Sequence, residues 1–337
     1  MARSAPDDGA VLLTQPEIRA LLPMEVCMEL VAGALAALAR GESHNPLRRG
    51  MLLPEKRGLL GMMPGRTPDA LGLKVVSVMP GNHGGELDAH QGVVVLFDPA
   101  TGVPRAVLDA SEITAIRTAA ASGVATRALA REDAGDLALL GSGVQARTHL
   151  EAMLVARNVR RVRVFSPRRE AREAFATHES ARHGLRVEAV DSARAAVEGA
   201  DLVCTTTSAR EPVLEGAWLA PGCHVNAAGA CTKATRELDG EAVRRARLFV
   251  DRRESAENEA GDLLLAVAEG VVTLAHVQGE LGEVLAGTLP GRRSRDEITL
   301  FESLGLAVED LAAAHYLERV ARERGLGARV ALGGRRS

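Results

Sequence analysis

The fold is decided by the stretch DLALLGSGVQARTHL, residues 136 to 150. The apolar run 137–140 predicts a strand, and a helical pattern follows the glycine-rich turn. Gly141 and Gly143 allow a tight turn and a close approach to a pyrophosphate, which the amides and the positive dipole end of the next helix would face. Because a strand and a helix flank this G-x-G-x-x-A motif, we predict a dinucleotide-binding loop. Its residues are Gly141, Ser142, Gly143, Val144, Gln145 and Ala146. The alternative is an ordinary turn between a strand and a helix.

Apolar strands alternate with helices from this point onward. The predicted strands are 137–140, 162–166, 186–190, 201–208, 224–229 and 246–251. This rhythm indicates a parallel sheet covered by helices on both faces, a Rossmann-type doubly wound α/β domain. After Asp251 we expect helical segments, a solvated turn at Arg292 to Arg295, and a last helix from Ser303 to about Arg324 that packs back on the N-terminal region.

The N-terminal region has a different pattern. Thr14 and Glu17 form a capping box for a short helix, and a second helix from Met24 to Arg40 stops at Gly41. Short apolar runs broken by Gly and Pro then extend to Asp109, which predicts antiparallel strands in an α+β domain. A long helix capped by Ser111 would lead into the Rossmann domain. We therefore predict a domain of residues 1–118, completed by 306–337, and a domain of residues 119–305.

Composition excludes several classes of protein. The 337 residues carry a net charge of −3 and only 2% aromatic residues, which gives no reason to expect a nucleic-acid or membrane surface. The longest apolar stretch is too short to span a bilayer, and the first ten residues lack the apolar segment of a signal peptide. Four scattered cysteines suggest a reduced, cytoplasmic protein. His83 and His90 flank a glycine-rich loop without metal-ligand spacing, so we expect no metal.

The end of the second Rossmann strand selects the dinucleotide. It reads Phe165-Ser-Pro-Arg-Arg169, with no acidic residue to hold the ribose 2′-hydroxyl of NAD. Ser166, Arg168 and Arg169 suit the 2′-phosphate of NADP, since guanidinium groups form strong charge-assisted hydrogen bonds. We favour NADPH over NADH, which stays possible. In the alternative interpretation, Ser166 caps a helix and the arginines are solvated.

Three cations of the N-terminal domain are candidates for holding a substrate, expected between the domains. Arg48 follows NPL, Lys74 lies within the apolar strand GLKVVSV, and Arg117 lies in an otherwise uncharged helical stretch. A lysine in an apolar strand is costly without a partner, and an arginine can bind a carboxylate with two hydrogen bonds. Together they could clamp a carboxylate; singly, each could be a surface or salt-bridged cation.

The chain resembles the ornithine cyclodeaminase/mu-crystallin family over nearly its whole length. The matching motifs, in order, are NPLR, GLLGMMP, LGLKVV, HQGVVVLFD, ITAIRTAAASGVAT, LLGSGVQARTHL, HVNAAGA, RELD and ITLFESLGLAVEDLAAA. The resemblance implies a homodimer formed through the N-terminal domain, and it places Arg48, Lys74 and Arg117 at the carboxylate-binding positions. It also implies cofactor contacts by Thr118, Thr206, Gly229 and Ser303.

Two positions separate this chain from the cyclodeaminases of that family. Cys231 aligns with their catalytic aspartate, and Gly61 with a glutamate that helps to hold ornithine. Both would line the substrate site here. A neutral thiol has neither the charge nor the basicity of a carboxylate, so the resemblance is to the mu-crystallin-like branch of ketimine reductases and amino-acid dehydrogenases.

We therefore predict an NAD(P)H-dependent oxidoreductase that acts at the C=N or C–N bond of a small imino or amino acid. The preferred substrate is a cyclic ketimine carboxylate such as Δ1-pyrroline-2-carboxylate, and an alanine dehydrogenase-like activity fits the same class. Lys74 and Arg117 are the expected catalytic residues. The alternatives are an ornithine cyclodeaminase, which converts ornithine to proline and ammonia, and a non-catalytic protein that binds NADPH or another small molecule.

Overall fold

The computed structural model describes residues 9–82 and 86–333, and it divides into two compact units. Unit 1 comprises Met1–Arg117 and Leu306–Ser337, and unit 2 comprises Thr118–Gly305. His83 lies outside the described residues, as do the first eight residues of the N-terminal stretch. His90, expected in a loop, is the first residue of a strand. The predicted mixture of a Rossmann sheet and an α+β region is confirmed.

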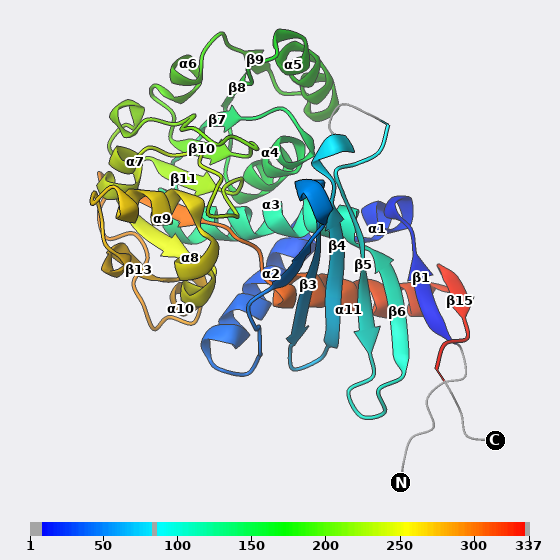
Figure 1. Cartoon of the computed structure of the whole chain (residues 1–337). Helices are drawn as coiled ribbons and strands as arrows, with labels where there is room; N and C mark the ends of the chain where they lie inside the picture. The colour runs from blue at the N-terminus through cyan, green and yellow to red at the C-terminus, as the bar shows by residue number, and fades with distance from the viewer. Residues whose placement is uncertain (1–8, 83–85, 334–337) are drawn as a thin grey trace, which may run out of the picture. The chain divides into compact units, whose positions relative to one another are not determined.

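Unit 1 contains a seven-stranded sheet in the order β15-β1-β6-β5-β4-β3-β2. The strands are β1 (Ala10–Leu13), β2 (Arg49–Leu52), β3 (Leu59–Arg66), β4 (Leu71–Val78), β5 (His90–Phe97), β6 (Pro104–Asp109) and β15 (Ala328–Val330). Strands β2 to β6 pair antiparallel, as predicted. β1 and β15, which lie side by side at one edge, were not predicted from the sequence (Figure 1). Each has at most four residues, too few to show an alternating pattern.

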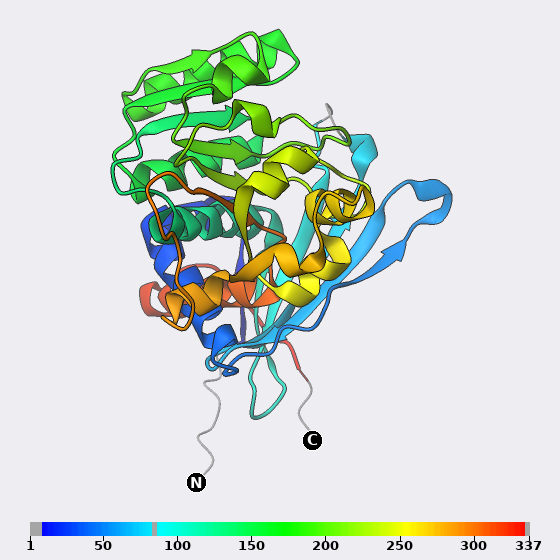
Figure 2. The same ribbon diagram turned by 90° about the vertical axis from the view of Figure 1, so that its left-hand side faces the viewer.

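The helices of unit 1 are α1 (Gln15–Leu21), α2 (Met24–Ala39) and α11 (Ala307–Arg324). The Glu17 carboxylate accepts a hydrogen bond from Thr14 N at 2.9 Å, which confirms the predicted cap. α11 runs along one face of the sheet, and α2 packs against α11 (Figures 1 and 2). In the part of the chain that the structure describes, no single helix is long and apolar enough to cross a membrane. α1 and α2 together have that length and composition, but they bend by 85° at their junction.

The two faces of this sheet differ in their cover. An ideal Cβ at Gly72 would lie 2.9 Å from Leu311 Cδ2, so α11 lies directly on that face. The opposite face exposes several large apolar side chains. Leu12, Met62 and Val93, for example, are 40%, 38% and 37% exposed. Unit 1 therefore has one covered and one open apolar sheet face.

The long helix α3 (Ala110–Leu129) begins one residue earlier than its predicted cap. The cap is Asp109, whose Oδ1 accepts a hydrogen bond from Glu112 N at 3.0 Å. Ser111, the residue predicted for that role, lies inside the first turn and donates its hydroxyl to His90 O. The cap prediction was wrong because Asp109 also ends β6, and the pairing of β6 with β5 fixes where the helix starts.

Unit 2 contains an eight-stranded parallel sheet in the order β13-β12-β14-β11-β10-β7-β8-β9. The strands are β7 (Asp136–Leu140), β8 (Arg161–Phe165), β9 (Val187–Ala189), β10 (Leu202–Thr205), β11 (His224–Ala227), β12 (Ala246–Val250), β13 (Val277–Glu280) and β14 (Ile298–Glu302). The helices are α4 (Val144–Ala156), α5 (Arg169–His183), α6 (Ala193–Val197), α7 (Gly240–Arg245), α8 (Arg253–Glu259), α9 (Gly261–Ala268) and α10 (Leu281–Leu285). β7 pairs with β8 on one side and β10 on the other, so the strand order reverses there. Ligands of open parallel sheets bind at such a point, beyond the carboxyl ends of the strands.

The part of unit 2 after Asp251 departs from the prediction. β14 was not predicted as a strand, yet it lies between β11 and β12 inside the sheet. Ser303 follows β14 and does not begin a helix; the last helix starts at Ala307. Arg292 is half-buried and donates to Leu129 O at 2.7 Å, so the predicted solvated turn is restricted to residues 293–295.

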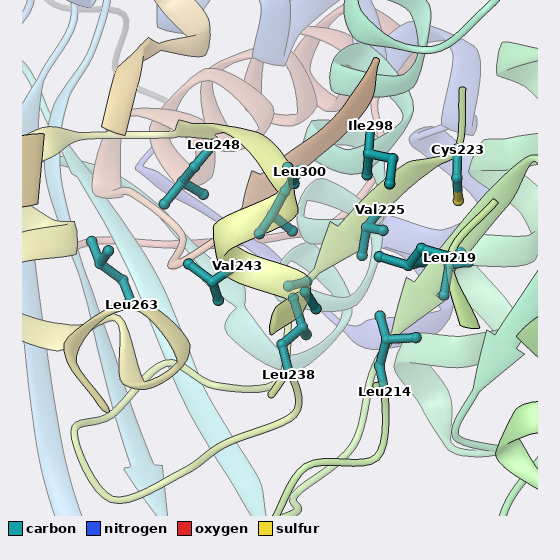
Figure 3. Packing of buried hydrophobic residues seen from close by; sticks show 14 of the residues in the cluster. Leu214, Leu219, Cys223, Val225, Leu238, Val243, Leu248, Leu263, Ile298 and Leu300 are labelled. Atoms are coloured by element: carbon teal, nitrogen blue, oxygen red, sulfur yellow. The ribbon is translucent and has the colours of Figure 1, made fainter. Parts of the chain in front are cut away.

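An aliphatic core lies beneath one side of this sheet (Figure 3). Val225 and Leu300 from β11 and β14 pack there with Leu238 and Leu263 from the connecting segments. All four are at most 1% exposed. This packing fixes the carboxyl ends of the strands, where the polar residues described next are found.

Candidate functional site

The glycine-rich loop follows β7 directly. Gly141 has φ +120°, and an ideal Cβ there would lie 2.7 Å from Thr206 Oγ1, so only glycine fits. Gly143 is exposed, and nothing lies within 4 Å of its ideal Cβ. Gly143 is also the N-cap of α4 and provides no side-chain cap. No side chain of Gly143 covers the backbone amides at the start of α4, and pyrophosphate binding requires such accessible amides.

Polar side chains lie in the loop and at the ends of other strands of the sheet. Ser142 Oγ donates to Ser166 Oγ at 2.9 Å, which joins the tips of β7 and β8. Gln145 Oε1 and Ser303 Oγ are buried without a hydrogen-bond partner among the described residues. Buried polar atoms are nearly always paired, so these two are suited to a polar ligand. Of the other loop residues, Val144 is exposed and Ala146 is buried in the first turn of α4. The unit thus fits a dinucleotide cofactor.

The tip of β8 contains no acidic residue. α5 begins at Arg169 with Arg168 as its N-cap, so the alternative in which Ser166 caps this helix is wrong. Arg169 is exposed and donates to Glu173 at 2.7 Å. Arg168 is exposed and has no ion pair with any residue that the structure describes. Arg172, which was not predicted from the sequence, is buried, donates to Ser166 O at 3.2 Å and stacks over Phe165.

The candidate cations of unit 1 lie in a buried ionic cluster. Lys74 Nζ lies 2.8 Å from Asp310 Oδ2 and 3.3 Å from Thr114 Oγ1. Arg117 donates from Nε to Asp310 Oδ1 and from Nη1 to Glu309 Oε2, both at 2.9 Å. The side chains of both cations are at most 6% exposed, and those of both acids are fully buried. β4, α3 and α11 therefore meet in one set of charge-assisted hydrogen bonds.

The sequence analysis did not name Glu309 and Asp310 as partners. One feature of the sequence could have indicated that they are buried: these two adjacent acids lie within an otherwise apolar stretch, AVEDLAAA. With the half-buried Arg48, whose charge lowers the pKa of Lys74, the cluster contains three cations and two anions.

The pKa values in the cluster follow from burial and charge. Burial lowers the pKa of Lys74 to about 8; Asp310 opposes this shift, and Arg117 adds to it. Burial raises the pKa of Asp310, but Arg117 and Lys74 outweigh burial and hold it below its usual value. Asp310 is therefore ionised at neutral pH, whereas Lys74 can exchange a proton near physiological pH.

The remaining predicted residues fall into the two units. Gly61 lies buried in β3, where an ideal Cβ would make an ordinary contact with Val76 Cγ1 at 3.4 Å. Thr118 is buried in α3 and is the first residue of unit 2. Gly229 follows β11. Cys231 is half-buried, with Sγ 3.4 Å from Ala228 O and 3.7 Å from Ser303 O. The structure therefore brings Cys231 and Ser303 together in unit 2.

The model of the ornithine cyclodeaminase/mu-crystallin family matches residues 9–325. The chain belongs to this family. It is 41% identical over 286 residues to the ketimine reductase mu-crystallin of Mus musculus, covering 83% of this chain and 87% of that protein. The predicted family and its mu-crystallin-like branch are confirmed.

Two solved structures share the fold over nearly the whole chain. One is the Δ1-pyrroline-2-carboxylate reductase of Thermococcus litoralis in complex with NADH and L-proline, with a TM-score of 0.93, 39% identity, and coverage of 95% of this chain and 100% of that chain. The other is an archaeal alanine dehydrogenase dimer with bound NAD, with a TM-score of 0.90, 33% identity, and coverage of 95% and 98%. The predicted class, a nicotinamide-dependent oxidoreductase acting at C=N or C–N bonds of imino or amino acids, is confirmed.

Two glycine substitutions separate the roles of the loop in folding and in binding. Gly141→Ala forces Cβ against Thr206 at positive φ, and we expect it to lower the free energy of unfolding by about 2 kcal/mol. The Cβ that Gly143→Ala adds meets no protein atom, so stability should be unchanged, but it covers the amides and should weaken binding of a nicotinamide dinucleotide about tenfold. Chemical denaturation and fluorescence titration measure the two effects. Equal nucleotide affinity in Gly143→Ala and wild type would contradict the assignment of this loop.

Proposed function

We propose that the chain reduces a cyclic ketimine carboxylate of the Δ1-pyrroline-2-carboxylate type and prefers NADPH. The observation that carries this proposal is the cluster that Arg48, Lys74 and Arg117 form with Glu309 and Asp310, because guanidinium and ammonium groups bind a carboxylate through charge-assisted hydrogen bonds. Gly61 and Cys231 provide no carboxylate for a second amine, as ornithine would require. The related reductase that binds NADH and L-proline supports the same substrate class.

The residues of the cluster have separate roles in this proposal. Arg48 and Arg117 hold the substrate carboxylate, and Asp310 with Glu309 fixes the orientation of the Arg117 guanidinium. Lys74, held by Asp310, donates a proton to the imine nitrogen. A bound reduced nicotinamide supplies the hydride for the imine carbon. Positioning and charge stabilisation dominate, because the cofactor contributes the difficult chemistry.

Unit 2 is the proposed cofactor domain. Its loop from Gly141 to Ala146 would hold the pyrophosphate, and Ser166 with Arg168 would hold the 2′-phosphate of NADP. Arg169 would contribute less, since it already pairs with Glu173. Thr118, Thr206, Gly229 and Ser303 would lie along the rest of the dinucleotide. Ser303 has the best support among these four, because its buried hydroxyl has no partner within the described residues.

Unit 1 is the proposed substrate and dimerisation domain. Its open apolar sheet face, with Leu12, Met62 and Val93, is suited to a second copy of the chain. The relationship to a dimeric alanine dehydrogenase supports a homodimer. The cytoplasmic location stays a prediction; each cysteine of the chain is a free thiol.

The central test is a steady-state assay with Δ1-pyrroline-2-carboxylate. We expect the purified protein to consume NADPH and to form proline in equal amounts. Ornithine with NAD⁺ should yield neither proline nor ammonia. Arg48→Ala should raise KM for the ketimine about 30-fold through the loss of charge-assisted hydrogen bonds.

The matched control is Arg49→Ala, which removes the neighbouring exposed arginine and should leave KM unchanged. Proline formation from ornithine without net cofactor change would identify a cyclodeaminase instead. Tight NADPH binding without turnover of any imine or amino acid in a panel would identify a binding protein.

Cofactor preference tests the tip of β8. Arg168→Ser should raise KM for NADPH about tenfold or more and leave KM for NADH unchanged, because only NADPH has the 2′-phosphate. Arg169→Ser is the matched comparison and should have a smaller effect, since Glu173 already occupies its guanidinium. A parallel loss for both nucleotides in Arg168→Ser would refute the assignment.

The proposed role of Lys74 predicts a pH dependence. The pKa of Lys74 is lowered to about 8, chiefly by burial, so the lysine is protonated below that pH and neutral above it. Hence kcat/KM for imine reduction should fall as the pH rises through about 8. Lys74→Arg, which stays charged, should lower kcat roughly 100-fold and abolish this alkaline limb. If Lys74→Arg showed the same fall in kcat/KM at alkaline pH as the wild type, that fall would be due to the titration of another group.

A further inference from the structure

Three acidic side chains of unit 2 lie buried at the carboxyl end of its parallel sheet. Glu302 ends β14, Asp262 lies in the first turn of α9, and Glu237 lies in the segment that follows β11. Their exposed fractions are 2%, 0% and 0%. Buried acids are costly unless they are paired or hydrogen-bonded, and none of these three forms an ion pair with a described residue.

Glu237 is surrounded by hydrogen-bond donors. Its Oε2 accepts from Thr205 Oγ1 at 2.8 Å and from Gly229 N at 2.7 Å, and its Oε1 accepts from Thr207 N at 2.5 Å. These donors favour the ionised carboxylate and oppose the effect of burial, which raises the pKa of Glu237. One side chain thereby joins the segment after β10 to the segment after β11.

The absence of a side chain at Gly229 makes this contact possible. An ideal Cβ at Gly229 would lie 2.5 Å from Glu237 Oε1 and 2.2 Å from Thr207 O. The Gly229 amide is therefore already engaged with Glu237. Glycine is required here for contact with the carboxylate, independently of any contact with a cofactor.

Asp262 holds Glu237 in turn. Its Oδ1 accepts from Glu237 N at 2.7 Å and from Leu238 N at 2.8 Å. The residues that follow the two acids, Leu238 and Leu263, are anchored in the aliphatic core (Figure 3). Glu237 therefore has a fixed backbone as well as a fixed carboxylate.

Glu302 differs from the other two acids. Its Oε2 is buried without a hydrogen-bond partner among the described residues, and so is Asp262 Oδ2. Burial raises the pKa of Glu302 well above its usual value, and Asp262, Glu237 and Asp251 raise it further. Burial raises the pKa of Asp262 as well, to about 7. Two backbone amides donate to Asp262, whereas Glu302 Oε2 has no donor among the described residues, so the proton belongs on Glu302.

We propose that Glu237 is a positioning residue for the cofactor, and that Glu302 remains protonated so that the carboxylates of Glu237 and Asp262 can share the buried site. The segments that Glu237 joins contain Thr206 and Gly229 and lead to Cys231. The inference thus rests on the proposed function, in which these segments line the dinucleotide and the substrate.

Glu237→Gln tests the positioning role. Whichever way the amide is oriented, its NH₂ group faces a backbone N–H, so at least one link is lost. We expect the Kd for NADPH and for NADH to rise about tenfold together, since a hydrogen bond to a charged group is lost. Thr205→Val, which removes one donor and keeps the carboxylate, should raise both Kd values by a smaller factor and guards against misfolding of the first variant. Glu269→Gln, which changes a half-exposed carboxylate paired with Arg236, is the matched control and should bind as wild type.

Binding by fluorescence titration separates the possible failures. If the wild type binds neither nucleotide, the proposed function fails and this inference fails with it. If the wild type binds and both Glu237→Gln and Thr205→Val bind equally well, only the positioning role is overturned.

Glu302→Gln tests the bound proton without any measurement of activity. A group with a raised pKa holds its proton in the folded state and loses it on unfolding, so wild-type stability should fall as the pH rises from about 5 towards the folded pKa. Glutamine has no proton to lose, and this variant should have a flatter dependence of stability on pH, with unchanged nucleotide affinity at neutral pH. Equal slopes in denaturation experiments across this range would show that Glu302 is not the protonated member.

Discussion

The structure of unit 1 depends on a single buried carboxylate, that of Asp310. It binds Lys74 from β4 and Arg117 from α3, and Glu309 gives Arg117 a second carboxylate. Removing one partner of a buried ion pair leaves the other charge unpaired, which costs about 3–5 kcal/mol. The sheet, α3 and α11 therefore have to meet in one geometry. The same geometry fixes the cations that the proposed chemistry uses.

Unit 2 uses buried acids in a different way. Around Glu237 and Asp262 the donors are mostly backbone amides, so the acids order loops and do not neutralise cations. The contrast follows from location, because the segments beyond a parallel sheet have amides that no strand pairing satisfies. Both units thus place charge in the interior; in the proposed function, one set holds a substrate group and the other shapes the surface around a cofactor.

The features that were predictable from the sequence are those that depend on residues close together along the chain. The glycine loop, the alternation of strands and helices, and the position of Lys74 within an apolar strand could all be predicted from neighbouring residues. The partner of Arg117 could not, since Asp310 lies 193 residues away along the chain. β14 was missed for a related reason: its place between β11 and β12 depends on pairing, which a five-residue run cannot reveal. Ser111 does not cap α3, because the pairing of β6 with β5 fixes the start of the helix two residues earlier, where Asp109 is the cap.

The return of α11 to unit 1 has a consequence for synthesis of the chain. Unit 2 is continuous in sequence, whereas unit 1 is interrupted by it and needs residues after 305. Until those residues leave the ribosome, Lys74 and Arg117 have no Asp310, and the sheet face beneath α11 stays uncovered. Domains fold as units during translation, so unit 2 can be complete while the first part of unit 1 still waits for its last helix. The first 117 residues of this protein thus become native only after its last helix has been made.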